Sequence, residues 1–166
     1  PSSVVEAARS VLIEEYPDSR ARRLQRSLAE LCSLETEQIA VVNGTSQALW
    51  LIALAYLSES DEVITFPPTY ADYAMVSSIM GAKTTEIATD PDNNFKPKVE
   101  RAVEVVRERP IRIVWLCNPN NPTSSYITRD EIEPLLEACA ERDTLLVLDE
   151  AYANFTLDRS ATEDLV

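Results

Sequence analysis

The sequence predicts an α/β fold built on a largely parallel sheet, and three observations lead to this prediction. Short apolar segments rich in β-branched residues alternate with amphipathic segments over residues 38–166. The chain has 166 residues, 45% of them hydrophobic, which is enough for one domain with a sizeable core. No repeat or low-complexity stretch interrupts the alternation in the sequence.

Each element follows from its local pattern. Residues 4–15 and 22–32 have apolar positions three and four residues apart, so they are predicted to be helices that precede the sheet. Five strands are predicted, at residues 39–42, 62–66, 83–87, 111–116 and 144–148. Four further helices are predicted, at residues 47–57, 71–80, 97–108 and 129–141. Thr128 and Glu131 have the spacing of a capping box at the start of the last helix, which we expect Pro134 to bend.

The first candidate site follows the strand predicted at 39–42. Ligands of parallel sheets bind at the carboxyl ends of the strands, so the residues after each strand are the ones to consider. Gly44, Thr45 and Ser46 open a helix there, where free backbone N–H groups and the positive end of the helix dipole can bind an anion. The alternative is that Thr45 or Ser46 simply caps the helix, and for this motif taken alone the cap is the more common case.

Two further loops carry an aromatic ring and several amides. Pro67 and Pro68 fix the chain direction before Tyr70, whose ring can stack on a planar heteroaromatic ligand or only pack in a rigid turn. Residues 118–123 read NPNNPT, and asparagines between prolines either offer fixed donors and acceptors to a ligand oxygen or form a tight turn.

Asp149 ends the strand predicted at 144–148. It either caps the strand or pairs with a buried cationic ring nitrogen, which would compensate for its desolvation. A magnesium-binding ATPase also has an Asp in this place, but it needs a glycine-rich phosphate loop followed by a lysine. The two glycines, Gly44 and Gly81, cannot form that loop or a dinucleotide-binding loop, so both classes are excluded.

The composition excludes further classes. The formal net charge of -13 disfavours nucleic acid and anionic membrane surfaces as partners, and the longest apolar run, 48–57, is too short to span a bilayer. Because the chain has no histidine, it cannot contain a Ser-His or Cys-His nucleophile or a His-ligated metal, and we expect no metal site. Cys32, Cys117 and Cys139 are expected to be reduced, mostly buried thiols of a cytoplasmic protein.

The order and spacing of four motifs, NGTSQA, FPPTYADY, NPNNPTSS and LVLDEAYANF, resemble the fold-type I pyridoxal-phosphate enzymes. Within them the sequence is most similar to the aminotransferases related to histidinol-phosphate aminotransferase and threonine-phosphate decarboxylase. The resemblance, from about Tyr16 to Phe155, implies a partial three-layer α/β/α sandwich. Residues 1–166 would be the N-terminal part of the cofactor-binding large domain, with leading helices at 1–37 and the sheet at 38–166, and without the small C-terminal domain.

The resemblance implies that seven residues bind the cofactor pyridoxal 5'-phosphate: Gly44, Thr45, Ser46, Tyr70, Asn121, Asp149 and Tyr152. The three residues at the helix start would bind the phosphate, and the tyrosine after the two prolines would stack on the pyridine ring. Asn121 and Tyr152 would hydrogen-bond the phenolic oxygen. Asp149 would pair with the pyridine nitrogen and keep it protonated.

The same resemblance implies some unusual geometry. Cis peptide bonds are expected before Pro68 and Pro122. The strand at 39–42 is expected to be separated from the other four strands, because two strands from later in the family's chain lie between them. Ser124 stands where the family usually has a glycine after N-P-T, which puts the local turn geometry in question.

The family's Schiff-base lysine is expected in a segment beyond the D-E-A-Y motif. The lysines of this chain, Lys83, Lys96 and Lys98, lack that context, so we expect no catalytic residue here and an inactive fragment. The parent protein would move an amino group between an amino acid and a 2-oxo acid, as a cytoplasmic homodimer. Decarboxylation of a phosphorylated amino acid with the same cofactor is the alternative reaction, and a non-catalytic binding or assembly role is the alternative for the chain as given.

Overall fold

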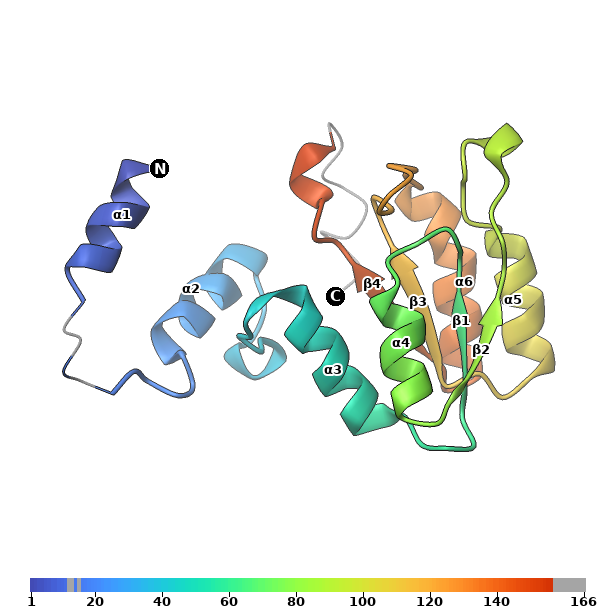
Figure 1. Cartoon of the computed structure of the whole chain (residues 1–166), viewed down its shortest axis with the longest axis horizontal. Coiled ribbons are helices and arrows are strands. Elements are labelled where there is room, and N and C mark those ends of the chain that lie inside the picture. Colours follow the sequence, from blue (N-terminus) through green and yellow to red (C-terminus); the bar gives the residue numbers. More distant parts are fainter. Residues whose placement is uncertain (12–13, 15, 157–166) are drawn as a thin grey trace. The chain divides into compact units, whose positions relative to one another are not determined.

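The computed structural model describes residues 1–11, 14 and 16–156, and the chain divides into two compact units, Pro1–Val41 and Val42–Val166. The first unit contains the helices α1 (Ser2–Arg9) and α2 (Arg22–Cys32) and the 3-10 helix η1 (Thr36–Gln38) (Figure 1). The Gln25 amide donates to the carbonyl oxygens of Thr36 and Ile39, at 2.8 and 2.7 Å, and so joins α2 to the segment after it.

Both helices predicted in the first unit are present. The helix predicted at 22–32 has the predicted bounds. The helix predicted at 4–15 begins two residues earlier and ends at Arg9, and residues 12, 13 and 15 of that prediction lie outside the described residues.

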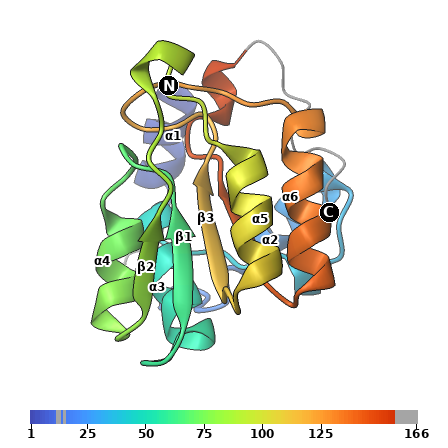
Figure 2. The same cartoon turned by 90° about the vertical axis from the view of Figure 1, so that its right-hand side faces the viewer.

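The second unit confirms the α/β class. Its strands are β1 (Glu62–Thr65), β2 (Lys83–Glu86), β3 (Ile113–Cys117) and β4 (Leu145–Asp149). They form a sheet of order β2-β1-β3-β4 in which every pair is parallel (Figure 2). The helices are α3 (Gly44–Tyr56), α4 (Asp72–Ile79), α5 (Val99–Glu108) and α6 (Arg129–Glu141), with short 3-10 turns η2 (Pro91–Asn93) and η3 (Ala153–Phe155).

Two apolar clusters place these helices on opposite faces of the sheet. Strand β3 is buried along its whole length, and its side chains alternate between the faces. Ile113 and Trp115 pack with residues of α3 and α4, whereas Val114 and Leu116 pack with residues of α5 and α6. The unit is therefore a three-layer α/β/α arrangement, as Figure 1 shows from the side.

One predicted element is absent from the described chain. Residues 39–42 form no strand in the described chain, so the strand predicted there is wrong. An apolar, β-branched segment needs a neighbouring strand for its N–H and C=O groups before it becomes a strand. Helix α6 has the predicted bounds, with Pro134 inside it, and the predicted capping box of Thr128 and Glu131 is present.

The cysteines are free thiols. Cys117 and Cys139 are buried and Cys32 is exposed, as the expectation of mostly buried thiols requires. Burial raises the pKa of Cys139 to about 12, so this thiol stays protonated at neutral pH. Among the described residues, no helix combines the length and the apolar character needed to cross a membrane.

Candidate functional site

The candidate site lies at the carboxyl ends of three adjacent strands. Because β1, β3 and β4 are neighbours and parallel, the loops that follow them meet at one edge of the sheet. A pocket of about 120 Å³ lies between these loops and the start of α3. Its lining residues are Thr45, Tyr70, Tyr73, Cys117, Asn121, Asp149, Ala151 and Tyr152. Five of the seven residues predicted to bind a cofactor therefore line one pocket.

The other two predicted residues, Gly44 and Ser46, flank this pocket at the start of α3. Ser46 Oγ lies 3.4 Å from Tyr70 Oη, so the helix start and the loop after β1 are in contact. Gly44 has a φ of 76°, and a Cβ atom added to it would meet nothing within 4 Å. The backbone at the beginning of α3 is therefore open to a ligand.

No side chain among the described residues caps the start of α3. The interpretation of Thr45 or Ser46 as the N-cap is therefore wrong: the cap position is Asn43, and its own backbone N–H donates to Gln47 Oε1 at 2.6 Å. With no hydroxyl or carboxylate in the way, the first-turn N–H groups can receive an anion.

Asp149 lies in the floor of the pocket and is 8% exposed. Its Oδ2 accepts a hydrogen bond of 2.8 Å from Tyr73 Oη, and its Oδ1 accepts one of 3.0 Å from the Ala151 N–H. A buried carboxylate with two donors still has unused acceptor capacity, and the most favourable further partner is a cation.

Tyr73 is fully buried and was not predicted as a site residue. Its ring stacks on Trp115 with the centroids 5.7 Å apart, and Tyr70 contacts it edge to face at the same separation. Burial raises the pKa of Tyr73 well above its usual range, and Cys117 and Asp149 raise it further, so Tyr73 remains a donor. The Tyr-x-x-Tyr spacing at the start of a helix was the one sequence signal that could have pointed to it.

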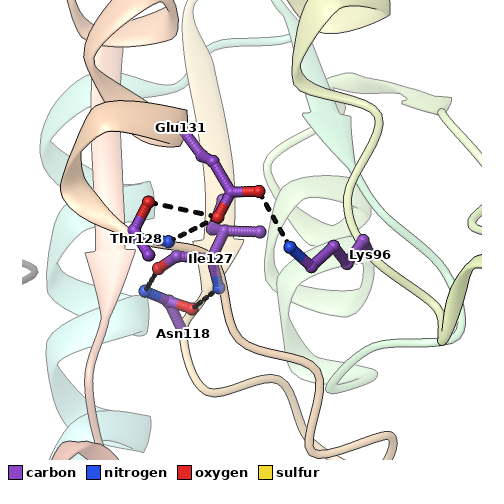
Figure 3. Close-up of polar contacts among 5 residues, drawn as sticks. All are labelled: Lys96, Asn118, Ile127, Thr128 and Glu131. Carbon is purple, nitrogen blue, oxygen red and sulfur yellow. Dashed lines mark hydrogen bonds and ion pairs between the residues drawn. The ribbon is translucent and has the colours of Figure 1, made fainter. Parts of the chain in front are cut away.

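Hydrogen bonds join the two ends of the loop after β3, at Asn118 and Ile127. Figure 3 shows the Asn118 amide bonded to both backbone groups of Ile127: Nδ2 donates to the carbonyl oxygen at 2.9 Å, and Oδ1 accepts from the N–H at 3.0 Å. One residue further on, the Thr128 N–H donates to Glu131 Oε2 at 2.8 Å, while Lys96 pairs with Glu131 Oε1 at 2.8 Å. These contacts, that of Lys96 first, lower the pKa of Glu131.

Asn121 projects from this loop into the pocket. The Cys117 thiol, which lines the same pocket, donates to the Pro119 carbonyl oxygen at 3.3 Å, and burial raises its pKa. Within the described residues, no hydrogen bond of the Asn121 side chain is found, so its amide is available to a ligand. Asn121 and Tyr152 also border a larger hollow of about 530 Å³ beside the pocket.

The backbone around the pocket has the predicted cis peptide bonds, before Pro68 and Pro122, and a third one, before Pro119, that was not predicted. Ser124 has a φ of 58°, so it adopts the left-handed conformation that favours glycine. Ser124 therefore holds a conformation that a glycine would adopt without strain.

None of the three lysines lines either hollow. Lys83 lies on the edge strand β2, Lys96 pairs with Glu131, and Lys98 precedes α5. The pocket contains an acid, amides, hydroxyls and aromatic rings. Such a set can bind a cation, an anion and a planar ring, but it holds no amine nucleophile among its described lining residues.

Comparisons with known proteins agree with this geometry. The sequence model of the family "Aminotransferase class I and II" matches residues 2–165. A histidinol-phosphate aminotransferase of Caldanaerobacter subterraneus subsp. tengcongensis is 35% identical over 153 residues, which are 92% of this chain and 42% of that protein. The chloroplastic histidinol-phosphate aminotransferase 1 of Arabidopsis thaliana is 36% identical over 141 residues, 85% of this chain and 32% of that protein.

Solved structures show the same relationship. An aspartate aminotransferase variant of Thermus thermophilus superposes with a TM-score of 0.88 at 30% identity, over 96% of this chain and 47% of that one. The aspartate aminotransferase of Thermotoga maritima gives a TM-score of 0.86 at 27% identity, over 100% of this chain and 47% of that one. The chain therefore belongs to the class I and II aminotransferase family and spans less than half the length of these relatives.

Aminotransferases of this family depend on pyridoxal 5'-phosphate, and the residues present fit that group. The open start of α3 matches a phosphate, the buried Asp149 matches a protonated ring nitrogen, and the free amide of Asn121 matches a ring oxygen. Tyr70 provides an aromatic face beside them.

Proposed function

We propose that this chain forms the cofactor-binding part of an aminotransferase that moves an amino group between an amino acid and a 2-oxo acid. The observation that supports this best is Asp149, a buried carboxylate fixed by Tyr73 and facing a pocket with room for a cationic ring nitrogen. When bound, pyridoxal 5'-phosphate supplies the electron-withdrawing ring that stabilises negative charge at the substrate α-carbon.

In this proposal the chain's own residues bind and orient. The N–H groups at Gly44, Thr45 and Ser46 hold the phosphate at the helix start. Tyr70 covers one face of the ring. Asn121 and Tyr152 hydrogen-bond the oxygen on the ring, and Asp149 holds a proton on the ring nitrogen because a neutral nitrogen would leave its own charge uncompensated.

We further propose that proton transfer and covalent attachment need residues outside this chain. The positions of Lys83, Lys96 and Lys98 support this, because none of them borders the pocket. Residues 1–166 would then be the N-terminal part of the large domain, inactive alone, with residues 1–37 leading into the sheet. The active protein would be a cytoplasmic homodimer. The names of the curated relatives make histidinol phosphate the first amino donor to test.

The binding part of the proposal is tested with pyridoxamine 5'-phosphate, which needs no lysine. Isothermal titration of the chain should show one site per chain. Asp149→Asn, which keeps the shape and removes the charge, should weaken binding by at least about tenfold, on the scale of a lost charge-assisted contact. Asp143→Asn, at a fully exposed acid, is the matched control and should change nothing. Absence of binding to the unaltered chain, or equal affinities for Asp149→Asn and the unaltered chain, would contradict the proposal.

The reaction itself is tested on the longest protein that the gene encodes. Incubation with an amino donor and 2-oxoglutarate should produce glutamate and no carbon dioxide. Release of carbon dioxide from a phosphorylated amino acid would favour the decarboxylase alternative instead, with the same binding site.

A further inference from the structure

Asn120 joins the two loops that carry Tyr70 and Asn121. Its Nδ2 donates to the Pro68 carbonyl oxygen at 2.9 Å, and its Oδ1 accepts from Thr69 Oγ1 at 2.7 Å. Pro68 and Thr69 lie in the loop after β1, directly before Tyr70, whereas Asn120 lies in the loop after β3, directly before Asn121. Both hydrogen bonds found between the described residues of these loops involve the Asn120 side chain.

Both Nδ2 hydrogens of Asn120 are used within the protein. Its second Nδ2 hydrogen is donated to Thr123 Oγ1 at 2.8 Å. Its backbone N–H donates to the Ser125 carbonyl oxygen, and its carbonyl oxygen accepts from the Ser124 N–H, each at 2.8 Å. Asn120 is 6% exposed; it borders the larger hollow but is absent from the lining of the smaller pocket. A buried amide that uses its donors within the protein acts on structure and does not contact what the pocket binds.

We propose that Asn120 is a positioning residue that fixes the separation between the Tyr70 ring and the Asn121 amide. This inference rests on the proposed function, in which those two residues bind the ring of pyridoxal 5'-phosphate. The bridge crosses from one loop to the other within one residue of Asn121 and two residues of Tyr70. Without it, no hydrogen bond between the described residues joins these two loops, so the two ring contacts lose their shared support.

The proposed role of Asn120 predicts different effects on the contacts to the ring and on the contacts to the phosphate. Among the described hydrogen bonds, none joins the start of α3 to Asn120. Loss of Asn120 should therefore weaken contacts to the ring and spare contacts to the phosphate. A residue that only supports overall stability would affect both in the same proportion.

The test compares two probes on the unaltered chain and on Asn120→Ala. Affinity for pyridoxamine 5'-phosphate should fall about tenfold, because small misplacements of binding groups have effects of this size. Affinity for inorganic phosphate, measured by competition at the same site, should not change. Thr69→Val removes one of the two bridging bonds while retaining the side-chain shape, so it should give a smaller loss in the same direction. Added to Asn120→Ala, it should cause no further loss, because that bond is already gone.

The matched control is Thr144→Val, which removes a buried hydroxyl bonded to the Ile111 carbonyl oxygen at the opposite end of β4. It should leave both affinities unchanged. If Asn120→Ala does not fold, the Thr69→Val result decides alone. Equal losses for the two probes, or no loss with either Asn120→Ala or Thr69→Val, would overturn the role of Asn120 while the site stands. Failure of the unaltered chain to bind pyridoxamine 5'-phosphate would instead overturn the proposed function and this inference with it.

Discussion

Tyr73 donates a hydrogen bond of 2.8 Å to Asp149, which lies 76 residues further along the chain. The bond joins the first turn of α4 to the last residue of β4 and replaces one of the water molecules that the carboxylate loses on burial. Because the raised pKa of Tyr73 keeps its hydroxyl protonated, the bond keeps the same donor across the whole working pH range. Asp149 therefore has a fixed orientation before any ligand arrives.

Tyr73→Phe should lower the free energy of unfolding by about 1–3 kcal/mol, because the buried carboxylate loses one of its two hydrogen-bond donors. The measurement is urea denaturation followed by circular dichroism. Tyr56→Phe is the control: Tyr56 is an exposed tyrosine, and its replacement should change stability by no more than about 0.5 kcal/mol. Equal stabilities for the two variants would show that the bond to Asp149 contributes nothing.

The two glycines should respond differently to alanine. Both have positive φ, so each substitution should cost about 1–2 kcal/mol of stability. At Gly81 the new Cβ would also lie 3.0 Å from Glu59 Cα, whereas at Gly44 it would project into open space at the start of α3. We expect Gly44→Ala to weaken phosphate binding and Gly81→Ala to leave it unchanged, as measured by titration with inorganic phosphate. The reverse order of affinities would contradict an anion site at Gly44.

Glu131 should make a small contribution to stability that depends on pH. Its folded pKa is lowered from 4.5 by Lys96 and by the Thr128 N–H, so its ionised form is favoured in the folded state. The contribution is present above the unfolded pKa and is lost as the pH falls through the lower folded value. Because both side chains of the pair are 41% exposed, we expect less than about 1 kcal/mol.

Lys96→Met should therefore raise the pKa of Glu131 and flatten the acid limb of the stability curve. Carboxyl chemical shifts across an NMR titration measure the first effect, and urea midpoints between neutral pH and pH 3 measure the second. Lys98→Met, two residues away and outside the pair, is the control. An unchanged Glu131 titration in Lys96→Met would sink this explanation.

Addition of pyridoxal 5'-phosphate followed by borohydride should give no stoichiometric adduct at a single lysine. None of the three lysines borders the pocket, so any modification should be slow and spread over exposed amines. Peptide mass spectrometry of the reduced protein locates the labelled positions. One equivalent of label confined to Lys83, Lys96 or Lys98 would show that a lysine reaches the site.

Strand β4 should mediate association of the chain. The Leu145 N–H donates to the Arg112 carbonyl oxygen, on the side of β3. Because successive N–H groups of a strand point to opposite sides, those of Leu146 and Leu148 point to the other edge of β4, which pairs with no described strand. We expect oligomers whose fraction rises with concentration in sedimentation experiments. In hydrogen exchange, the amides of Leu146 and Leu148 should become protected as the concentration rises, while that of Val147 is protected throughout. A monodisperse monomer with rapid exchange of the Leu146 amide at every concentration would show that this edge of β4 does not mediate association.

Local patterns were sufficient to predict most of the helices and strands. The capping box at Thr128 and the apolar periodicity define α6 from one end to the other, because both are properties of neighbouring residues. The apolar segment 39–42 has the same composition as a strand, yet strand formation also depends on a partner that composition does not reveal.

The candidate site was also only partly predictable from the sequence. Motif order placed Thr45, Tyr70, Asn121, Asp149 and Tyr152, and the pocket brings these five together. The residues that hold them were missed, since their roles depend on contacts between distant segments. Tyr73 matters because of Asp149, and Asn120 because of a loop 51 residues earlier. Local spacing marks both residues, but it does not reveal these partners, which lie far away in the sequence.

The pairing of β4 with β3 also limits how this gene can change in length. The register sets Cys117 opposite Asp149, and successive residues of a strand face opposite sides of the sheet. Insertion or deletion of a single residue inside β4 would turn Asp149 away from Tyr73 and toward the layer of α5 and α6, with a leucine or Glu150 in its place. Related genes should therefore differ in length before β4 begins or beyond residue 150, and an alignment of them should show no gap within the strand.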